Sequence, residues 1–99
     1  MLNIQQTTEN GTARVSLEGR LDTLSAPELE RELKELLPGM TELTLDFEKL
    51  DYISSAGLRV LLSAQKQMNK QGEMKLINVN ETIMEIFDVT GFVDILTIV

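Results

Sequence analysis

The apolar and polar positions of this chain form short alternating runs and longer runs with helical spacing. Residues 44–47 alternate in the manner of a strand, and leucines recur at helical intervals from Leu58 onward. Near the N-terminus, residues 2–6 and 13–17 are typical of two short strands, and Asn10-Gly11 between them suits the positive φ angles of a tight turn. We therefore expect the chain to begin with an antiparallel hairpin.

Three segments combine helical spacing with the signals that start and stop helices. The first begins at Ser25, which can cap it, with Pro27 in the first turn and Glu28 able to close a capping box. The second runs from Ser55 to about residue 71, and the third follows the cap Asn80 and ends near residue 91. These signals predict three helices.

The remaining apolar runs complete an alternating order of strands and helices. Residues 43–47 and 74–79 are expected strands on either side of the second helix, and residues 95–98 form a last apolar run. Right-handed crossovers place such strands parallel in one sheet, which helices cover. The sequence thus predicts an α/β fold: one domain over residues 1–99, a mixed and mostly parallel sheet of about five strands, an N-terminal antiparallel hairpin and three to four helices.

Missing residue types exclude several kinds of chemistry. The chain contains no histidine and no cysteine, so it has no imidazole base, no serine triad of the usual kind, no His- or Cys-based metal site and no disulfide. It also lacks the glycine-rich sequence with lysine that cradles nucleotide phosphates in P-loop proteins. We expect no catalytic residues, no metal and no cofactor, and a protein that is not an enzyme.

The charge and the apolar runs limit where the protein acts and what it binds. A formal net charge of −7, with the cations scattered among sixteen acids, argues against direct binding to nucleic acid. A partner with a basic surface, or plain solubility, would each account for the acidity. Since the sequence has no targeting segment and no apolar run of about eighteen residues, we expect a cytoplasmic protein that does not insert into membranes.

The most informative segment joins an expected strand to an expected helix: Tyr52-Ile53-Ser54-Ser55-Ala56-Gly57-Leu58-Arg59. Ser54 and Ser55 lie at the helix N-terminus, where unpaired N–H groups and the helix dipole accommodate a hydroxyl or a phosphate on it. The two serines could therefore act as simple caps or as a phosphorylation point. Gly57 costs the helix about 1 kcal/mol relative to alanine, which either packing against the strand or close approach of a partner would explain.

Three signatures in order give the whole chain a family resemblance. They are Gly19-Arg20-Leu21-Asp22, residues 50–58 and Phe87-Asp88-Val89-Thr90-Gly91-Phe92. Together they resemble the STAS domain of sulphate transporters and bacterial anti-sigma factor antagonists. The resemblance implies an anti-anti-sigma factor, regulated by partner switching, that binds an anti-sigma serine kinase when unphosphorylated and thereby frees a sigma factor. That kinase would inactivate the protein by phosphorylating a loop serine, and a serine phosphatase would reset it.

The resemblance also suggests which serine is modified. The family loop commonly reads D-S-S-G or D-S-T-G, with the first serine phosphorylated, and alignment on Gly57 places Ser55 at that position. Ser54 then replaces the usual acid and remains a rival acceptor, while Ala56 replaces the second hydroxyl residue. The implied partner-binding residues are Asp22, Ser54, Ser55, Ala56, Gly57, Leu58 and Arg59.

The sequence leaves several alternatives open. Asp22 could be a turn residue before the Ser25 cap or a rim residue beside the serine loop, and Arg59 could meet a partner's acids, meet a nucleotide phosphate, or have no role. The protein could also be a STAS accessory subunit that regulates a membrane transport system without phosphorylation. Neighbouring genes for a kinase or sigma factor, as against transporter genes, would distinguish the two functions.

Overall fold

A computed structural model describes residues 2–99 and contains one four-stranded sheet with the order β1-β2-β3-β4. The strands are β1 (Leu2–Glu9), β2 (Thr12–Leu21), β3 (Glu42–Ile53) and β4 (Glu73–Ile77). The helices are α1 (Ala26–Leu36), α2 (Ser55–Gln71) and α3 (Glu81–Thr90), followed by the short 3₁₀ helix η1 (Phe92–Asp94). Strands β1 and β2 are antiparallel and the other neighbours are parallel, so the predicted mixed α/β sheet is confirmed.

The N-terminal hairpin is confirmed together with its turn. Asn10 and Gly11 have φ angles of 50° and 84°, so both central residues adopt the left-handed conformation that the dipeptide was expected to supply. The two strands pair in continuous register from Leu2 opposite Gly19 to Glu9 opposite Thr12. The turn sequence therefore fixes which side chains of β1 and β2 share a face.

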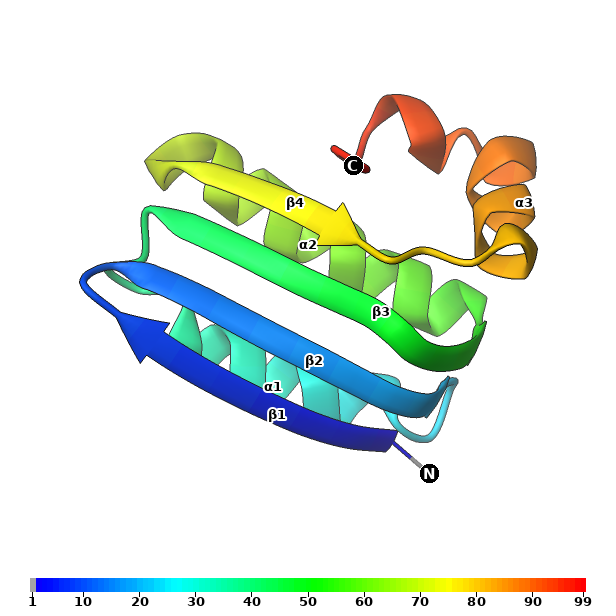
Figure 1. Cartoon of the computed structure of the whole chain (residues 1–99), viewed down its shortest axis with the longest axis horizontal. Helices are drawn as coiled ribbons and strands as arrows, with labels where there is room; N and C mark the ends of the chain where they lie inside the picture. The colour runs from blue at the N-terminus through cyan, green and yellow to red at the C-terminus, as the bar shows by residue number, and fades with distance from the viewer. Residues whose placement is uncertain (1) are drawn as a thin grey trace.

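Helices α1 and α2 lie behind one face of the sheet, and α3 lies beyond the end of β4 (Figure 1). Because side chains alternate along a strand, β2 turns Ala13, Val15 and Leu17 toward the helices. The Phe47 and Phe87 rings, with centroids 6.4 Å apart, join α3 to the same core. One layer of helices on one sheet face therefore holds the buried apolar side chains.

The second half of β3 departs from strict alternation because it contains two irregularities in register. Ser16 and Glu18 pair with Asp46 and Lys49, and Gly19 and Arg20 pair with Leu50 and Tyr52, so β3 gains one extra residue at each step. The buried residues there are consequently three apart: Phe47, Leu50 and Ile53. This is why the alternation predicted a strand ending at residue 47, whereas β3 continues to Ile53.

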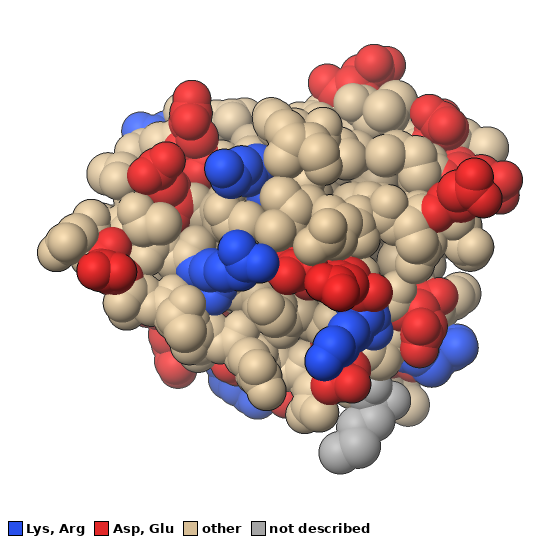
Figure 2. Space-filling model, in the orientation of Figure 1, with Lys and Arg blue, Asp and Glu red and all other residues tan. Residues whose placement is uncertain are grey.

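The face of the sheet opposite the helices is polar, with cations and acids interleaved across it (Figure 2). Asp46 lies at its centre and is largely buried: one carboxylate oxygen pairs with Arg14 Nη2 at 2.9 Å, and the other accepts from Asn78 Nδ2 and the Glu48 N–H, both at 3.0 Å. Burial by itself would raise the pKa of Asp46, but these donors outweigh it and hold the pKa below its usual value. Asp46 thus connects β2, β3 and the segment after β4.

The last apolar run does not form the fifth strand that the sequence suggested. Only Ile98 pairs with β4, in a single parallel bridge to Leu76, with the Leu76 N–H donating to Thr97 O and the Val99 N–H donating to Leu76 O. The residues immediately before it form η1 and pack against α3, which leaves too little extended chain for a strand. The sheet therefore has four strands and one added bridge.

The expected side-chain cap of the first helix is also wrong. Ser25 occupies the cap position, but its hydroxyl donates to Arg20 O at 2.7 Å and accepts from the Asp22 N–H at 2.9 Å instead of bonding to the helix. By contrast, the Asn80 side chain does cap α3, accepting from the Ile83 N–H at 2.9 Å. Ser25 thus stabilises the turn between β2 and α1.

The Asp46 contacts predict an acid-sensitive contribution to stability. Asp46→Asn should lower the free energy of unfolding at pH 7 by about 1 to 2 kcal/mol, because Arg14 and the amide donors lose a charged acceptor. The folded-state pKa is depressed, so the contribution is present above the unfolded pKa of about 3.9 and is lost as the pH falls through the folded value. Urea unfolding at pH 7 and pH 3 would measure it.

The control is Glu48→Gln, which removes an exposed acid from the same strand. This variant should follow the wild type at both pH values. A gap between Asp46→Asn and wild type that is as large at pH 3 as at pH 7 would contradict the role assigned to the Asp46 charge.

Candidate functional site

The two serines that follow β3 occupy different positions at the start of α2. Ser54 is the cap residue in an extended conformation, and its hydroxyl oxygen accepts from the Gly57 N–H at 3.4 Å, a long hydrogen bond. Ser55 is the first residue of α2 and is exposed. The Ser54 hydroxyl is therefore engaged in local structure, whereas the Ser55 hydroxyl faces solvent.

The turn containing these serines lies against the turn that follows β2. The Ser54 N–H donates to Leu21 O at 2.9 Å, which continues the pairing of β2 with β3 one step beyond Ile53. This bond holds the Cα atoms of Leu21 and Ser54 within about 7 Å, and the next Cα along each chain segment is about 3.8 Å farther, so the Cα atoms of Asp22 and Ser55 are at most about 14 Å apart. The structure thus brings together two residues that are far apart in the sequence, at the carboxyl end of β2 and β3 (Figure 1).

Asp22 organises its own turn and remains half-buried at the rim. One carboxylate oxygen accepts from the Leu24 and Ser25 N–H groups at 3.0 and 3.1 Å, and the other lies 3.7 Å from Arg20 Nε. The hydrogen bond from the Ser25 N–H is the largest of the effects that lower the pKa of Asp22, and the carboxyl is consequently ionised at neutral pH. Asp22 is therefore a turn residue that also presents negative charge beside the serine loop.

Gly57 and Leu58 belong to the core and not to the exposed part of this region. A Cβ atom on Gly57 would lie 2.8 Å from both Ile53 Cγ1 and Leu21 Cγ, so the absence of a side chain lets α2 approach the sheet. Leu58 is buried in the same core, whereas Ala56 is partly exposed. Packing against the strands fully explains the glycine. The candidate residues that are at least partly exposed are Asp22, Ser54, Ser55, Ala56 and Arg59.

Within residues 2–99, no three acidic side chains are grouped so that they could hold a metal ion. None of the helices described in this range is long and apolar enough to cross a membrane. The polar groups at the surface of this region are the Ser55 hydroxyl, the Asp22 carboxylate and the Arg59 guanidinium.

Comparison with known proteins identifies the family. The model of the STAS domain matches residues 3–99. The anti-sigma-B factor antagonist of Bacillus subtilis is 32% identical over 98 residues, which cover 98% of this chain and 90% of that protein. BtrV of Bordetella bronchiseptica, a candidate anti-sigma factor antagonist, is 39% identical over 88 residues, covering 87% and 76%.

The chain belongs to the STAS domain family.

Among solved structures, the phosphorylated form of the Bacillus cell fate determinant SpoIIAA has the same fold, with a TM-score of 0.76 and 19% identity over 98% of this chain and 91% of that one. The resemblance found in the three sequence signatures is thereby confirmed.

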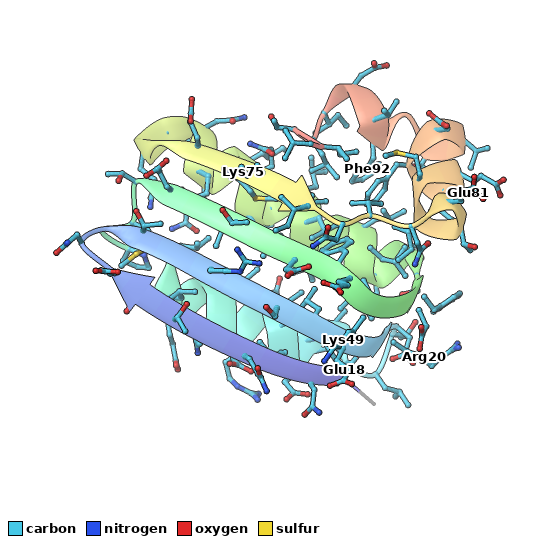
Figure 3. All side chains as sticks on the ribbon, in the orientation of Figure 1. Glu18, Arg20, Lys49, Lys75, Glu81 and Phe92 are labelled. Carbon is cyan, nitrogen blue, oxygen red and sulfur yellow. The ribbon has the colours of Figure 1, made fainter. Side chains whose placement is uncertain are left out.

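At the end of the sheet where β2 and β3 finish, this STAS domain also exposes side chains to which the sequence analysis assigned no role. Leu24, in the turn after Asp22, is 90% exposed, and the Arg20 guanidinium stacks 4.3 Å above the centre of the partly exposed Tyr52 ring. Figure 3 shows Arg20 at the end of the sheet where β2 and β3 finish. Leu24 precedes α1 and lies outside the helically spaced leucines of that helix. The sequence pattern therefore gave it no place in the core, which is consistent with its exposure.

The close approach at Gly57 predicts that a normally favourable substitution destabilises this STAS domain. Alanine is the better helix former by up to about 1 kcal/mol, but overpacking a core costs about 1 to 3 kcal/mol. Gly57→Ala should therefore lower the free energy of unfolding, because Ile53 and Leu21 must move aside. Urea denaturation of the wild type and of Gly57→Ala would give the difference in the free energy of unfolding.

The exposed position Ser63 supplies the matched comparison in the same helix. There, alanine should be more stable than glycine by about 1 kcal/mol. If alanine stabilised position 57 as it does position 63, the steric explanation of Gly57 would be wrong.

Proposed function

We propose that this STAS domain is an anti-sigma factor antagonist that is switched by phosphorylation of Ser55. In its unphosphorylated form it would bind an anti-sigma serine kinase in the cytoplasm and so free a sigma factor. The observation that carries the proposal is an exposed serine at the first position of α2, in a chain 32% identical over nearly its whole length to an anti-sigma-B factor antagonist.

The local geometry supports Ser55 over Ser54 as the acceptor. A kinase needs an accessible hydroxyl, and Ser55 is exposed, while the Ser54 oxygen accepts the Gly57 N–H as the helix cap. A phosphate on Ser54 would have to give up or distort that cap, whereas a phosphate on Ser55 would extend into solvent at the positive end of the helix dipole. The same residues, with Asp22, Ala56 and Arg59, are the proposed partner surface.

The names of the relatives favour this function over that of an accessory subunit for membrane transport. The Bacillus subtilis relative is an anti-sigma-B factor antagonist, and the solved SpoIIAA structure is of a phosphorylated form. A serine phosphatase that restores the free hydroxyl is the second enzyme that such a cycle requires. The protein itself would act only by binding.

Incubation with its kinase and ATP should place one phosphate on Ser55. Ser55→Ala should abolish incorporation, and mass spectrometry of the peptide covering residues 50–66 would locate the group. Ser54→Ala is the matched control: it should lose about 1 kcal/mol of stability with the cap but still accept phosphate. Labelling of Ser55→Ala together with loss of labelling in Ser54→Ala would assign the site to Ser54 instead.

Phosphorylation should change binding much more than folding. Charge near an exposed helix end alters stability by about 0.3 to 1 kcal/mol, whereas a phosphate pressed against a packed partner must lose its water and can cost several kcal/mol. Affinity for the kinase should therefore fall at least tenfold, about 1.4 kcal/mol, while the Tm moves by a few degrees.

Both quantities would be measured on one phosphorylated sample, by isothermal titration calorimetry and by thermal unfolding followed by circular dichroism. Unchanged affinity, or loss of native secondary structure on phosphorylation, would contradict a switch that acts at the interface.

A further inference from the structure

Arg59 lies one helical turn after Ser55, and both side chains are exposed. Residues four apart on an α-helix have Cβ atoms about 5 to 6 Å apart and can contact each other. The exposed row continues along α2 through residues that are all neutral or basic: Ser63, Lys66 and Lys70. Residues 55–71 include no acid at all, so α2 offers Arg59 no carboxylate to pair with.

The other arginine near the serine loop is already engaged. Arg20 stacks on Tyr52 and lies 3.7 Å from an Asp22 carboxylate oxygen. The ion pairs within 4.0 Å in residues 2–99 are those of Arg14 and Arg20, which leaves the Arg59 guanidinium without a counter-charge in the described part of the chain. A new anion on Ser55 would thus meet an unpaired cation on its own helix face.

We propose that Arg59 captures the phosphate of phosphorylated Ser55 and holds it along the surface of α2. The proposal rests on the phosphorylation of Ser55 proposed above. A guanidinium can donate two parallel hydrogen bonds to phosphate oxygens, and an anion four residues before a cation is the favourable order on a helix. The first turn of α2 contains no acidic residue that would compete for Arg59.

This capture gives phosphorylation a second effect on the docking surface. The modification adds about −1.5 to −2 charges to the surface that already contains the Asp22 carboxylate, and at the same time it ties down the Arg59 guanidinium. A partner that meets Arg59 with an acidic group would lose that contact as well as meeting the phosphate. One modification would therefore change the surface in two ways: it adds the phosphate charge and it occupies the Arg59 guanidinium.

The test uses protein in which phosphoserine is incorporated at position 55 during synthesis, so that no kinase is needed. Phosphorus NMR would follow the second ionisation of the phosphate as a function of pH. Because Arg59 stabilises the doubly charged form, Arg59→Ala should raise the pKa of the phosphate by roughly 0.3 or more, and Arg59→Lys should raise it less. Lys66→Ala, a cation of the same exposed row farther along α2, should leave it unchanged.

Two results would overturn the proposal. An unchanged phosphate pKa in Arg59→Ala would show that no capture occurs, and a rise in Arg20→Ala but not in Arg59→Ala would assign the phosphate to Arg20. Circular dichroism of each variant would establish that the helix is intact. Since the phosphate is built in, this outcome is independent of the kinase experiment, whose failure would count against the proposed function alone.

Discussion

The hydrogen bond from the Ser54 N–H to Leu21 O is the contact on which the candidate site depends. It extends the pairing of two parallel strands into the turns that follow them, and so holds the Asp22 turn beside the start of α2. The bond requires α2 to begin directly against the sheet, and this is possible because Gly57 has no side chain to meet Leu21 and Ile53. The position of Ser55 therefore follows from backbone pairing and from one missing methyl group.

The asymmetry between the two serines follows from the same geometry. Ser54 has an extended backbone and its hydroxyl oxygen accepts from the Gly57 N–H, while Ser55 is already part of the helix and is exposed. In the D-S-S-G form of the loop, a carboxylate would occupy the place of Ser54 as cap. The neutral hydroxyl here performs the capping with less negative charge next to the acceptor serine, which makes a nearby cation such as Arg59 more effective toward a phosphate.

How much the sequence predicted depended on whether a feature was local. The Asn10-Gly11 turn, the Asn80 cap and the extent of α2 follow from short-range signals, and all three were predicted. The end of β3 was missed because each register step adds a residue and changes the spacing of buried positions from two to three. The Ser25 hydroxyl bonds to the end of β2, and Ile98 pairs with β4. The local sequence pattern predicted neither contact.

The site followed the same rule: the serines, the helix start and the apolar spacing that begins at Leu58 are local patterns, but the contact between Gly57 and Leu21 of the neighbouring strand is not. Net charge was the least informative quantity, because −7 for the whole chain suggested a basic partner, whereas α2 itself carries three cations and no acid. A docking partner at this surface would meet one carboxylate, that of Asp22, at the turn after β2 and cationic groups along α2. A partner that is complementary to such a surface must carry charges of both signs in a fixed arrangement. This requirement constrains the orientation in which the partner docks more than it raises the affinity. A phosphate on Ser55 would add negative charge at the N-terminal end of α2, beside the turn that contains Asp22, and would alter that arrangement of charges.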